Sequence, residues 1–425
     1  DLDAAVEHAP GPYRYQAVFL NARLAYTNNG VAGAFRGFGA VQVQYALEQQ
    51  MDRLATLAGH DPGSFRALNL AAPDAPGPLG QSVVPFDGPH RALDVARQEP
   101  LWRGPHRWSS AGGRYRHGVG LALVHRSDGF GKGGPSGGRI ELALAADGAI
   151  ELRCGFTELG QNLLGAIQGL CRQHLGCALH EVRPVLGDTR CTPDSGPVAA
   201  SRATTMVWRA LVALRDAWRT RLLAAASRQL GIPPGSSELY LGAGGIHGAQ
   251  GRLVLSYEAL AAGWTGEHPV LAVDLHPEDP KDNAHDTHFV FGACAALAQG
   301  RIDSWGRGGR GGGLHIGSAL GAVVSEQGYM GQMEGGALMG QAMCTQEDLP
   351  CVGGHYTARN LDEYLIPTMA DAPVMEVIAI ENLPAGDPIG PRGAGEISVN
   401  IATPGGGNAL ATAPGPPATR LRLTP

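Results

Sequence analysis

The order of apolar and polar positions predicts a helix early in the chain. Apolar residues recur at helical spacing from Val43 to Ala58, so residues 40–58 are expected to form an amphipathic helix, with Gly59 as a stop signal directly after it. Residues 73–105 are rich in proline and glycine and show no clear period. This stretch is interpreted as a linker with short turns.

The middle of the chain is expected to contain strands that lead into helices. Residues 138–156 alternate between apolar and polar side chains around an Asp-Gly pair, which is the pattern of a β-hairpin. A helical period follows and stops at Gly176. A longer helix is expected to start near Ser201 and to end at Gly231.

Strand pairs followed by helices recur later in the chain. Residues 232–284 are interpreted as a smaller connecting unit, and a second set of strands begins near residue 287. The methionine-rich segment 331–343 is interpreted as a buried helix, in which the methionines fill the core. Glycine-rich residues 300–321 depart from a regular strand–turn–strand and are expected to be a flexible segment or a local reading-frame error. This order predicts a layered α+β fold; no GxGxxG stands between a strand and a helix as in a Rossmann fold.

Composition narrows the classes of function. The chain has 425 residues, 44% of them hydrophobic and 17% charged, which is enough for a substantial core in two or three domains or layers. A formal charge of −6 without a basic stripe argues against a nucleic-acid partner, and no apolar run approaches the roughly 18 residues of a membrane span. The 7 cysteines have no CxxC spacing. They argue against a disulfide framework, a zinc site or an iron–sulfur cluster, and they predict a reducing, cytoplasmic compartment.

Glycine, with 63 residues, marks the segments that carry candidate chemistry. Five segments combine small residues with one polar side chain at an expected helix start or sharp turn, namely 35–40, 157–162, 198–205, 331–336 and 392–398. Unsatisfied N–H groups and the helix dipole favour anions at helix starts. A single segment of this kind is usually a structural turn. Five of them predict convergence on one large, multiply anionic cofactor.

These segments, in this order, resemble those of a known family. The matching stretches are "GAFRGFGAVQ", "TELGQNLLGAIQ", "GDTRCTPDSGPVAAS", "GQMEGGALMGQAM" and "RGAGEISVNIATPGGGNAL". Over nearly its whole length the chain resembles the molybdopterin-binding large subunit of the xanthine dehydrogenase/aldehyde oxidase family, and bacterial xanthine dehydrogenase subunits most closely. The resemblance implies the α+β layers of molybdenum-cofactor-binding domains. Residues 1–110 would be the end of the first domain plus a linker, and residues 111–425 the second domain.

The resemblance gives the central role to Glu396, which matches the catalytic glutamate of the family's GxGE motif. Hydroxylation with water-derived oxygen needs a base that removes a proton from the attacking oxygen, and a carboxylate within hydrogen-bond reach is suited to this. Burial among Gly393, Gly395 and apolar neighbours is expected to make it a stronger base. The alternative is a glutamate that only caps a helix.

Further site residues are implied in the same way. Phe38 is expected to stack on a flat aromatic substrate, and Arg36 to line the cofactor side of the site. Without the resemblance, Phe35 and Phe38 would be interpreted as core residues. The metal would be held by the pterin dithiolene and not by protein side chains. The positions implied to contact the cofactor are Arg36, Gly37, Gly160, Gln161, Ala200, Ser201 and Gln332.

The implied activity is oxidation of purines such as hypoxanthine or xanthine by a molybdenum hydroxylase. The cofactor would be molybdenum–molybdopterin, with the cytosine dinucleotide as one form. Electrons would leave through Fe–S and FAD groups on partner subunits, because this chain has no motif for either. An aldehyde, an aromatic thioester or another N-heteroaromatic stays open as the substrate.

The sequence also departs from the family pattern. The long half that precedes this region in the family is missing, and the first residue is Asp1, so the chain is expected to be a fragment that acts only with that half and with partner subunits. Ala203 stands where a family hydroxyl often contacts the cofactor phosphate. A truncated remnant that binds a pterin or packs against partners without catalysis is the alternative.

Overall fold

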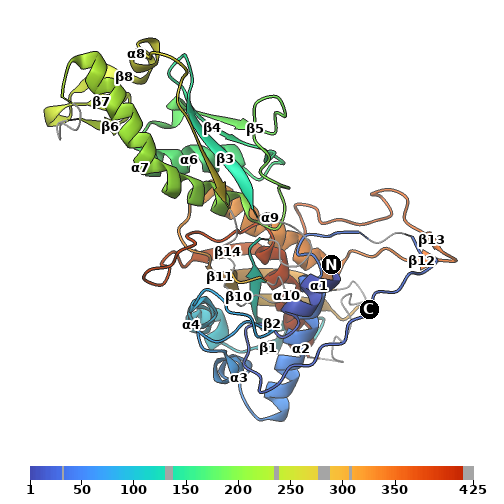
Figure 1. The fold of residues 1–425 in the computed structure, drawn as a ribbon. Coiled ribbons are helices and arrows are strands. Elements are labelled where there is room, and N and C mark those ends of the chain that lie inside the picture. The colour runs from blue at the N-terminus through green and yellow to red at the C-terminus, as the bar shows by residue number, and fades with distance from the viewer. Residues whose placement is uncertain (31–32, 130–136, 234–238, 276–287, 306–308, 415–425) are drawn as a thin grey trace.

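The computed structural model describes residues 1–30, 33–129, 137–233, 239–275, 288–305 and 309–414, which form two lobes (Figure 1). Its α-helices are α1 (Leu2–His8), α2 (Ala40–Leu57), α3 (Pro62–Asn69), α4 (Gly88–Gln98), α5 (Pro100–Arg103), α6 (Leu163–Leu175), α7 (Ala203–Leu230), α8 (Tyr257–Ala262), α9 (Glu326–Thr345) and α10 (Ile397–Thr412). Its strands are β1 (Arg107–Ser109), β2 (Tyr115–Ser127), β3 (Gly138–Leu144), β4 (Ile150–Cys154), β5 (Val182–Leu186), β6 (Tyr240–Gly242), β7 (Gly245–His247), β8 (Leu253–Ser256), β9 (Val270–Leu275), β10 (Phe291–Asp303), β11 (Gly309–Ala319), β12 (Cys351–Val352), β13 (His355–Tyr356) and β14 (Val374–Ala379). Within these described ranges, no helix combines the length and the apolar character needed to cross a membrane.

The larger lobe is built on a five-stranded sheet with the order β1-β2-β10-β11-β14. Its central strands, β2 and β10, pair antiparallel, whereas β14 joins β11 in parallel. Side chains alternate between the two faces of a strand. On β2, Leu121 and Leu123 therefore pack toward α4 on one face, and Ala122 and Val124 pack toward α9 and α10 on the other. The sheet is covered on both faces, which explains why its central strands are almost continuously apolar.

Helix α10 lies at the centre of the larger lobe and is buried along nearly its whole length. It has no polar face because it packs between the sheet and α9. Two glycines of β2 allow its backbone to approach the sheet. A Cβ at Gly118 would lie 2.1 Å from the backbone oxygen of Ala409, and one at Gly120 would lie 2.1 Å from its nitrogen.

Gly120→Ala should therefore lower the free energy of unfolding by about 1–3 kcal/mol, because the added methyl group overlaps backbone atoms that cannot rotate away. Urea denaturation of the purified chain measures the change. Gly335→Ala is a suitable control, because a Cβ at Gly335 meets no atom within 4 Å and alanine favours the helix by about 0.5–1 kcal/mol. Equal stability of the two variants would contradict the close approach of α10.

The smaller lobe is a four-stranded sheet with the order β5-β4-β3-β9, packed against α6 and α7. Trp218 of α7 is fully buried in its core. The small sheet β6-β7-β8 and helix α8 share this core through Ile246 and Leu260. Strand β9, which the sequence assigned to a connecting unit over 232–284, pairs with β3 and belongs to the main sheet of this lobe. Residues 276–284 of that unit lie outside the described residues.

Most predicted elements are present. The hairpin is β3–β4, and the predicted helices are α2, α6, α7 and α9. The linker predicted over 73–105 is wrong in part, because it contains α4 and α5. Pro89 and Pro100 lie in the first turns of these helices, where the missing N–H of proline is harmless, so they mark helix starts. The irregularity predicted for 300–321 is also wrong for the described residues, because β10 and β11 pair antiparallel there. Residues 306–308 between the two strands lie outside the described residues.

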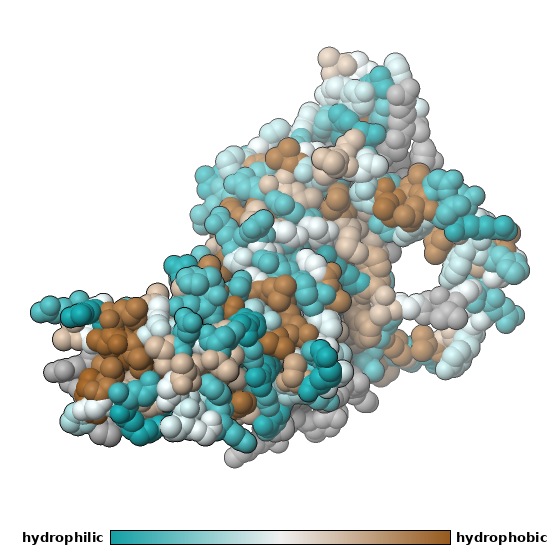
Figure 2. All heavy atoms as spheres, turned by 90° about the horizontal axis from the view of Figure 1, so that it is seen from above, coloured by the Kyte–Doolittle hydropathy of each residue, from teal (hydrophilic) through white to brown (hydrophobic). Residues whose placement is uncertain are grey.

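Two segments form an arm beside the larger lobe, namely residues 14–30 and 346–373. The segments contact each other where Cys351 Sγ lies 3.6 Å from Asn29 Oδ1. Figure 2 shows the arm standing away from the body around an opening. The arm exposes large apolar side chains; Phe19 is 88% exposed and Met369 is 96% exposed. Exposed apolar side chains in such numbers are typical of contact surfaces.

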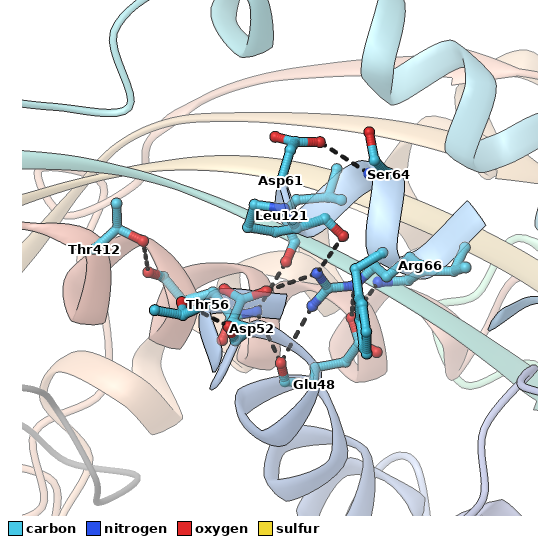
Figure 3. Close-up of polar contacts among 12 residues, drawn as sticks. Glu48, Asp52, Thr56, Asp61, Ser64, Arg66, Leu121 and Thr412 are labelled. Carbon is cyan, nitrogen blue, oxygen red and sulfur yellow. Dashed lines mark hydrogen bonds and ion pairs between the residues drawn. The ribbon is translucent and has the colours of Figure 1, made fainter. Parts of the chain in front are cut away.

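A buried polar network joins α2, α3 and β2 (Figure 3). Arg66 donates from Nε to Glu48 Oε2 at 2.8 Å and from Nη1 to Asp52 Oδ1 at 2.6 Å. Glu48 also accepts from the Leu123 backbone at 2.7 Å and from the Tyr13 hydroxyl at 2.5 Å. Burial opposes the charge of Arg66, but the two carboxylates hold its pKa well above its usual range. The network fixes α2, which follows the turn that carries Arg36.

Candidate functional site

A cavity of about 390 Å³ lies where the two lobes meet. The smaller lobe contributes the start of α6 and the loop before α7, and the larger lobe contributes α9, the loop before α10 and the turn before α2. Of the residues predicted from the sequence, the cavity wall contains Arg36, Gln161, Ala200, Ser201, Gln332 and Glu396. Gly37 lies beside Glu396, whereas Phe38 and Gly160 are not among the wall residues.

The turn before α2 explains why this stretch carries so few side chains. Gly37, Phe38 and Gly39 follow one another with φ of 93°, 48° and 89°. A Cβ at Gly37 would lie 2.4 Å from the side chain of Val41 and 2.6 Å from Asn400 Oδ1. Glycine is therefore required there, and the turn directs the Gly37 N–H at Glu396 Oε1, 3.3 Å away.

Phe38 is not a core residue, because its side chain is 42% exposed. A left-handed conformation costs a bulky residue about 1–2 kcal/mol. Strain of this kind collects at functional sites, where the surrounding structure imposes it. The ring is thus held outward by the turn, open to a ligand, and its predicted role in substrate stacking stays a prediction.

Arg36 joins three segments of the chain that are distant in sequence. Its Nε donates to the backbone oxygen of Gly395, and its Nη2 donates to Gln332 at 3.2 Å (backbone oxygen) and 3.1 Å (Oε1). Burial lowers the pKa of Arg36, and the charge of Glu396 opposes that shift. The guanidinium therefore fixes α9 and the loop before α10 relative to the turn before α2.

Glu396 is the N-cap residue of α10, but its side chain makes no capping hydrogen bond to the helix. The interpretation as a simple helix cap therefore does not fit. Instead, Oε2 accepts from Arg126 Nη2 at 2.8 Å, and the side chain is 16% exposed toward the cavity. The sequence led us to expect glycine and apolar neighbours, and the structure adds a buried guanidinium next to the carboxylate.

The sequence reasoning missed Arg126 and its neighbour Asp128. Both follow the apolar run of β2, where the chain changes to "HRSD" at residues 125–128. Polar residues at the end of a buried strand were the available signal. Asp128 Oδ2 accepts from Thr205 Oγ1 at 2.8 Å and from the Gly393 N–H at 3.0 Å, so this carboxyl group holds the loop that leads to Glu396.

Burial raises the pKa of Asp128 to about 6 from its ordinary value of 3.8, although two hydrogen bonds and two nearby arginines oppose the shift. Between pH 3.8 and about 6 the folded state therefore binds more protons at this site than the unfolded state. The contribution of Asp128 to the protein's free energy of unfolding should therefore fall as the pH rises from 3.8 to about 6.

Asp128→Asn should remove this pH dependence, because the amide oxygen still accepts hydrogen bonds but cannot ionise. The variant should exceed the wild type in free energy of unfolding by about 1–3 kcal/mol at pH 7, and the difference should shrink toward pH 4. Urea denaturation of both proteins at pH 4.5 and pH 7 tests this. A difference that stays constant between these pH values would contradict the assignment.

The start of α6 does not match the expectation that its N–H groups are free to bind an anion. The carboxylate of Glu158 already accepts from the backbone N–H groups of Gly160 at 2.9 Å, Asn162 at 3.1 Å and Leu164 at 3.0 Å. Burial opposes its charge, but these N–H groups lower the pKa of Glu158. The side chain of Gln161 bonds its own loop, donating to the Thr157 oxygen at 2.9 Å. This helix start therefore offers few free donors.

The start of α7 faces the cavity. Ala203 and Thr204, in its first turn, line the cavity. The first N–H groups of a helix have no partner within the helix, and the dipole of this 28-residue helix adds positive potential there. Residues 331–336, by contrast, lie inside α9 and not at its start, so Gln332 reaches the cavity from the middle of a helix.

Comparisons with known proteins assign the family. Residues 2–70 and 96–373 match two profiles, each described as a molybdopterin cofactor-binding domain. The chain belongs to the molybdopterin cofactor-binding domain family. A probable xanthine dehydrogenase subunit from Bacillus subtilis (strain 168) is 37% identical over 418 residues, which are 95% of this chain and 53% of the relative. The 6-hydroxypseudooxynicotine dehydrogenase complex subunit gamma of Paenarthrobacter nicotinovorans is 27% identical over 438 residues, which are 98% of this chain and 53% of that protein.

Solved structures share the fold of this molybdopterin cofactor-binding protein. Quinoline 2-oxidoreductase from Pseudomonas putida 86 has a TM-score of 0.73 at 18% identity, over 89% of this chain and 50% of that chain. Aldehyde oxidoreductase from Desulfovibrio gigas has a TM-score of 0.70 at 23% identity, over 92% of this chain and 40% of that chain. The present chain spans about half the length of the relatives it matches.

The cavity fits a molybdopterin cofactor. Ser201 Oγ is buried in the wall without a hydrogen-bond partner, so its hydroxyl can bond a polar group bound in the cavity. Ala200 and Ser201 both have left-handed backbones, with φ of 58° and 56°, which place this hydroxyl directly before the start of α7. Among the described residues, His, Cys, Asp and Glu side chains form no group of three that could hold a metal ion.

Proposed function

We propose that this chain is the molybdenum-cofactor-binding part of a hydroxylase that oxidises purines such as hypoxanthine and xanthine with water-derived oxygen. The similarity to the probable xanthine dehydrogenase subunit of Bacillus subtilis, over 95% of the chain, carries the proposal. The cavity supports it, since one carboxylate, one unpaired hydroxyl and the start of α7 face the same space.

The geometry supports the following roles for the chain's own residues. The start of α7 and Ser201 bind the anionic part of the cofactor, and Gln332 and Arg36 border its ring system. When bound, the molybdenum–pterin group supplies oxygen transfer and takes up electrons. Glu396 accepts the proton at Oε1, because Oε2 is already held by Arg126 and Oε1 has only a 3.3 Å contact with the Gly37 N–H. Phe38 presents its exposed ring to a planar substrate.

Partner subunits complete the enzyme in this proposal. Fe–S and FAD groups on those subunits carry the electrons away, and the half of the large subunit that this sequence does not span contributes the remaining site residues. Residues 1–110 and 111–425 correspond to the end of the first and to the second cofactor-binding domain.

The experiment that tests the proposal is metal analysis and turnover of the purified complex. The chain is co-expressed with the products of its neighbouring genes, its molybdenum content is measured, and xanthine oxidation is followed by the formation of uric acid. Molybdenum together with uric acid supports the proposal. The absence of molybdenum under every condition would favour a non-catalytic remnant.

A second candidate is oxidation of a different N-heteroaromatic. The match to the 6-hydroxypseudooxynicotine dehydrogenase subunit over 98% of the chain favours it. A complex that contains molybdenum but leaves xanthine unchanged, while it oxidises a pyridine or quinoline substrate, would select this candidate over the purine enzyme.

A further inference from the structure

Behind Glu396, on the side away from the cavity, lies a buried cation. The side chain of Arg126 is only 4% exposed, at the end of β2. A buried guanidinium needs both an anion and acceptors for its remaining N–H groups, or it becomes strongly destabilising. The groups that meet these requirements determine the orientation of the Arg126 guanidinium.

His8 of α1 orients the guanidinium. The Nδ1 of His8 lies 2.7 Å from the backbone oxygen of Ala4, a group that only accepts, so Nδ1 carries the proton. The Nε2 of His8 is then an acceptor, and it faces two donors, the Ser127 N–H at 3.1 Å and Arg126 Nη1 at 3.3 Å. Burial, and after it the charge of Arg126, lower the pKa of His8 well below its usual value, in agreement with a neutral ring.

The other ionisable groups near Arg126 are neutral or engaged elsewhere. Burial lowers the pKa of His125 to about 3, so this ring is uncharged. Glu7 binds both the ring Nδ1 and the backbone N–H of His288. Asp128 uses Oδ2 for Thr205 and Gly393, as described above. Among the described residues, Glu396 is the carboxylate that forms an ion pair with Arg126.

From this arrangement we propose that Arg126, held in one orientation by His8 and Ser127, is the positioning residue for Glu396; the inference rests on the proposed role of Glu396 as the base. Because Nη1 is fixed by His8 and by the hydroxyl and backbone oxygens of Ser127, Nη2 can hold Oε2 at 2.8 Å, and Oε1 is left beside the Gly37 N–H. The pair selects one rotamer of the carboxylate, which fixes where Oε1 lies.

The test uses Arg126→Met in the assembled complex, with xanthine as substrate. The kcat per bound molybdenum should fall roughly 10–100-fold while KM changes little, because substrate contacts are intact but the carboxylate is misplaced. Arg126→Lys should recover part of the loss, because its ammonium keeps a charge beside Oε2. Arg66→Met is the control: it breaks an Arg–Glu pair that is fully buried and lies away from the cavity, so it should lower stability and leave kcat per molybdenum unchanged.

Crystal structures of the Arg126→Met and His8→Phe complexes provide a readout that does not depend on turnover. The Glu396 carboxylate is expected to leave the Gly37 N–H in both. Unchanged kcat in Arg126→Met, or an unmoved carboxylate in its crystal structure, would overturn the inference. If the wild-type complex lacks molybdenum or does not oxidise xanthine, the proposed function fails, and the crystal structures still decide whether Arg126 positions Glu396.

Discussion

Glu396→Gln should reduce turnover of the assembled enzyme by about 10²–10⁴-fold, the range expected when a general base is lost. Glutamine keeps the size of the side chain and an oxygen that can accept from Arg126 Nη2, so the local structure is retained. It cannot accept a proton at the position of Oε1. Steady-state kinetics per bound molybdenum measure the effect, and molybdenum content should stay near that of the wild type.

Glutamine is a better choice than alanine at this position. Alanine would leave the buried guanidinium of Arg126 without its carboxylate, and the resulting instability would be confused with a loss of chemistry. Glu334→Gln is the matched control, since Glu334 is exposed on the same helix as Gln332 but is not part of the cavity wall. A fully active Glu396→Gln enzyme with normal molybdenum content would show that another group takes the proton.

Arg66→Met should lower the free energy of unfolding by about 3–5 kcal/mol, the largest stability change expected for this chain. Arg66 and Glu48 are both fully buried, so removal of the guanidinium leaves the Glu48 carboxylate without a cation in the core. Asp52 loses the same partner but is 22% exposed and can be hydrated. Urea denaturation measures the difference.

A double variant separates the destabilisation caused by the unpaired Glu48 charge from the stability that the Arg66–Glu48 pair contributes. Glu48→Gln combined with Arg66→Met should recover much of the loss, because the amide oxygen can accept from the Leu123 N–H and the amide NH2 can donate to the Tyr13 hydroxyl oxygen, without a buried charge. Asp61→Ala, in the same region of Figure 3, removes only the N-cap of α3 and should cost about 1 kcal/mol. An Arg66→Met effect as small as that of Asp61→Ala would contradict the buried charge.

The sequence was informative wherever a local pattern decides the structure. The β3–β4 hairpin follows from alternation around Asp147-Gly148, and α6 and α7 end at the predicted Gly176 and Gly231, which both adopt the left-handed conformation. The order of the motifs identified the family and indicated Glu396 as a candidate site residue. These features depend on neighbours in the chain, so they can be recognised without a fold.

Features that depend on distant contacts were not predictable. Nothing near Arg126 in the sequence indicates a partner 270 residues away. The N–H groups at the start of α6 looked available, but whether Glu158 turns back to occupy them depends on a rotamer and not on the residue type. Helix α4 was not predicted, because proline occurs both in the first turn of helices and in linkers.

The three-way contact of Arg36 has a consequence for biosynthesis. The guanidinium and its acceptor, the backbone oxygen of Gly395, are 359 positions apart, so the last wall of the cavity is translated long after the first. At about 5–20 residues per second, a ribosome needs tens of seconds to cover that interval. A nascent chain therefore has no finished receptacle for its prosthetic group. Loading has to follow the synthesis of Gly395 and Glu396, and any chaperone that delivers the group must recognise a chain already folded to that point.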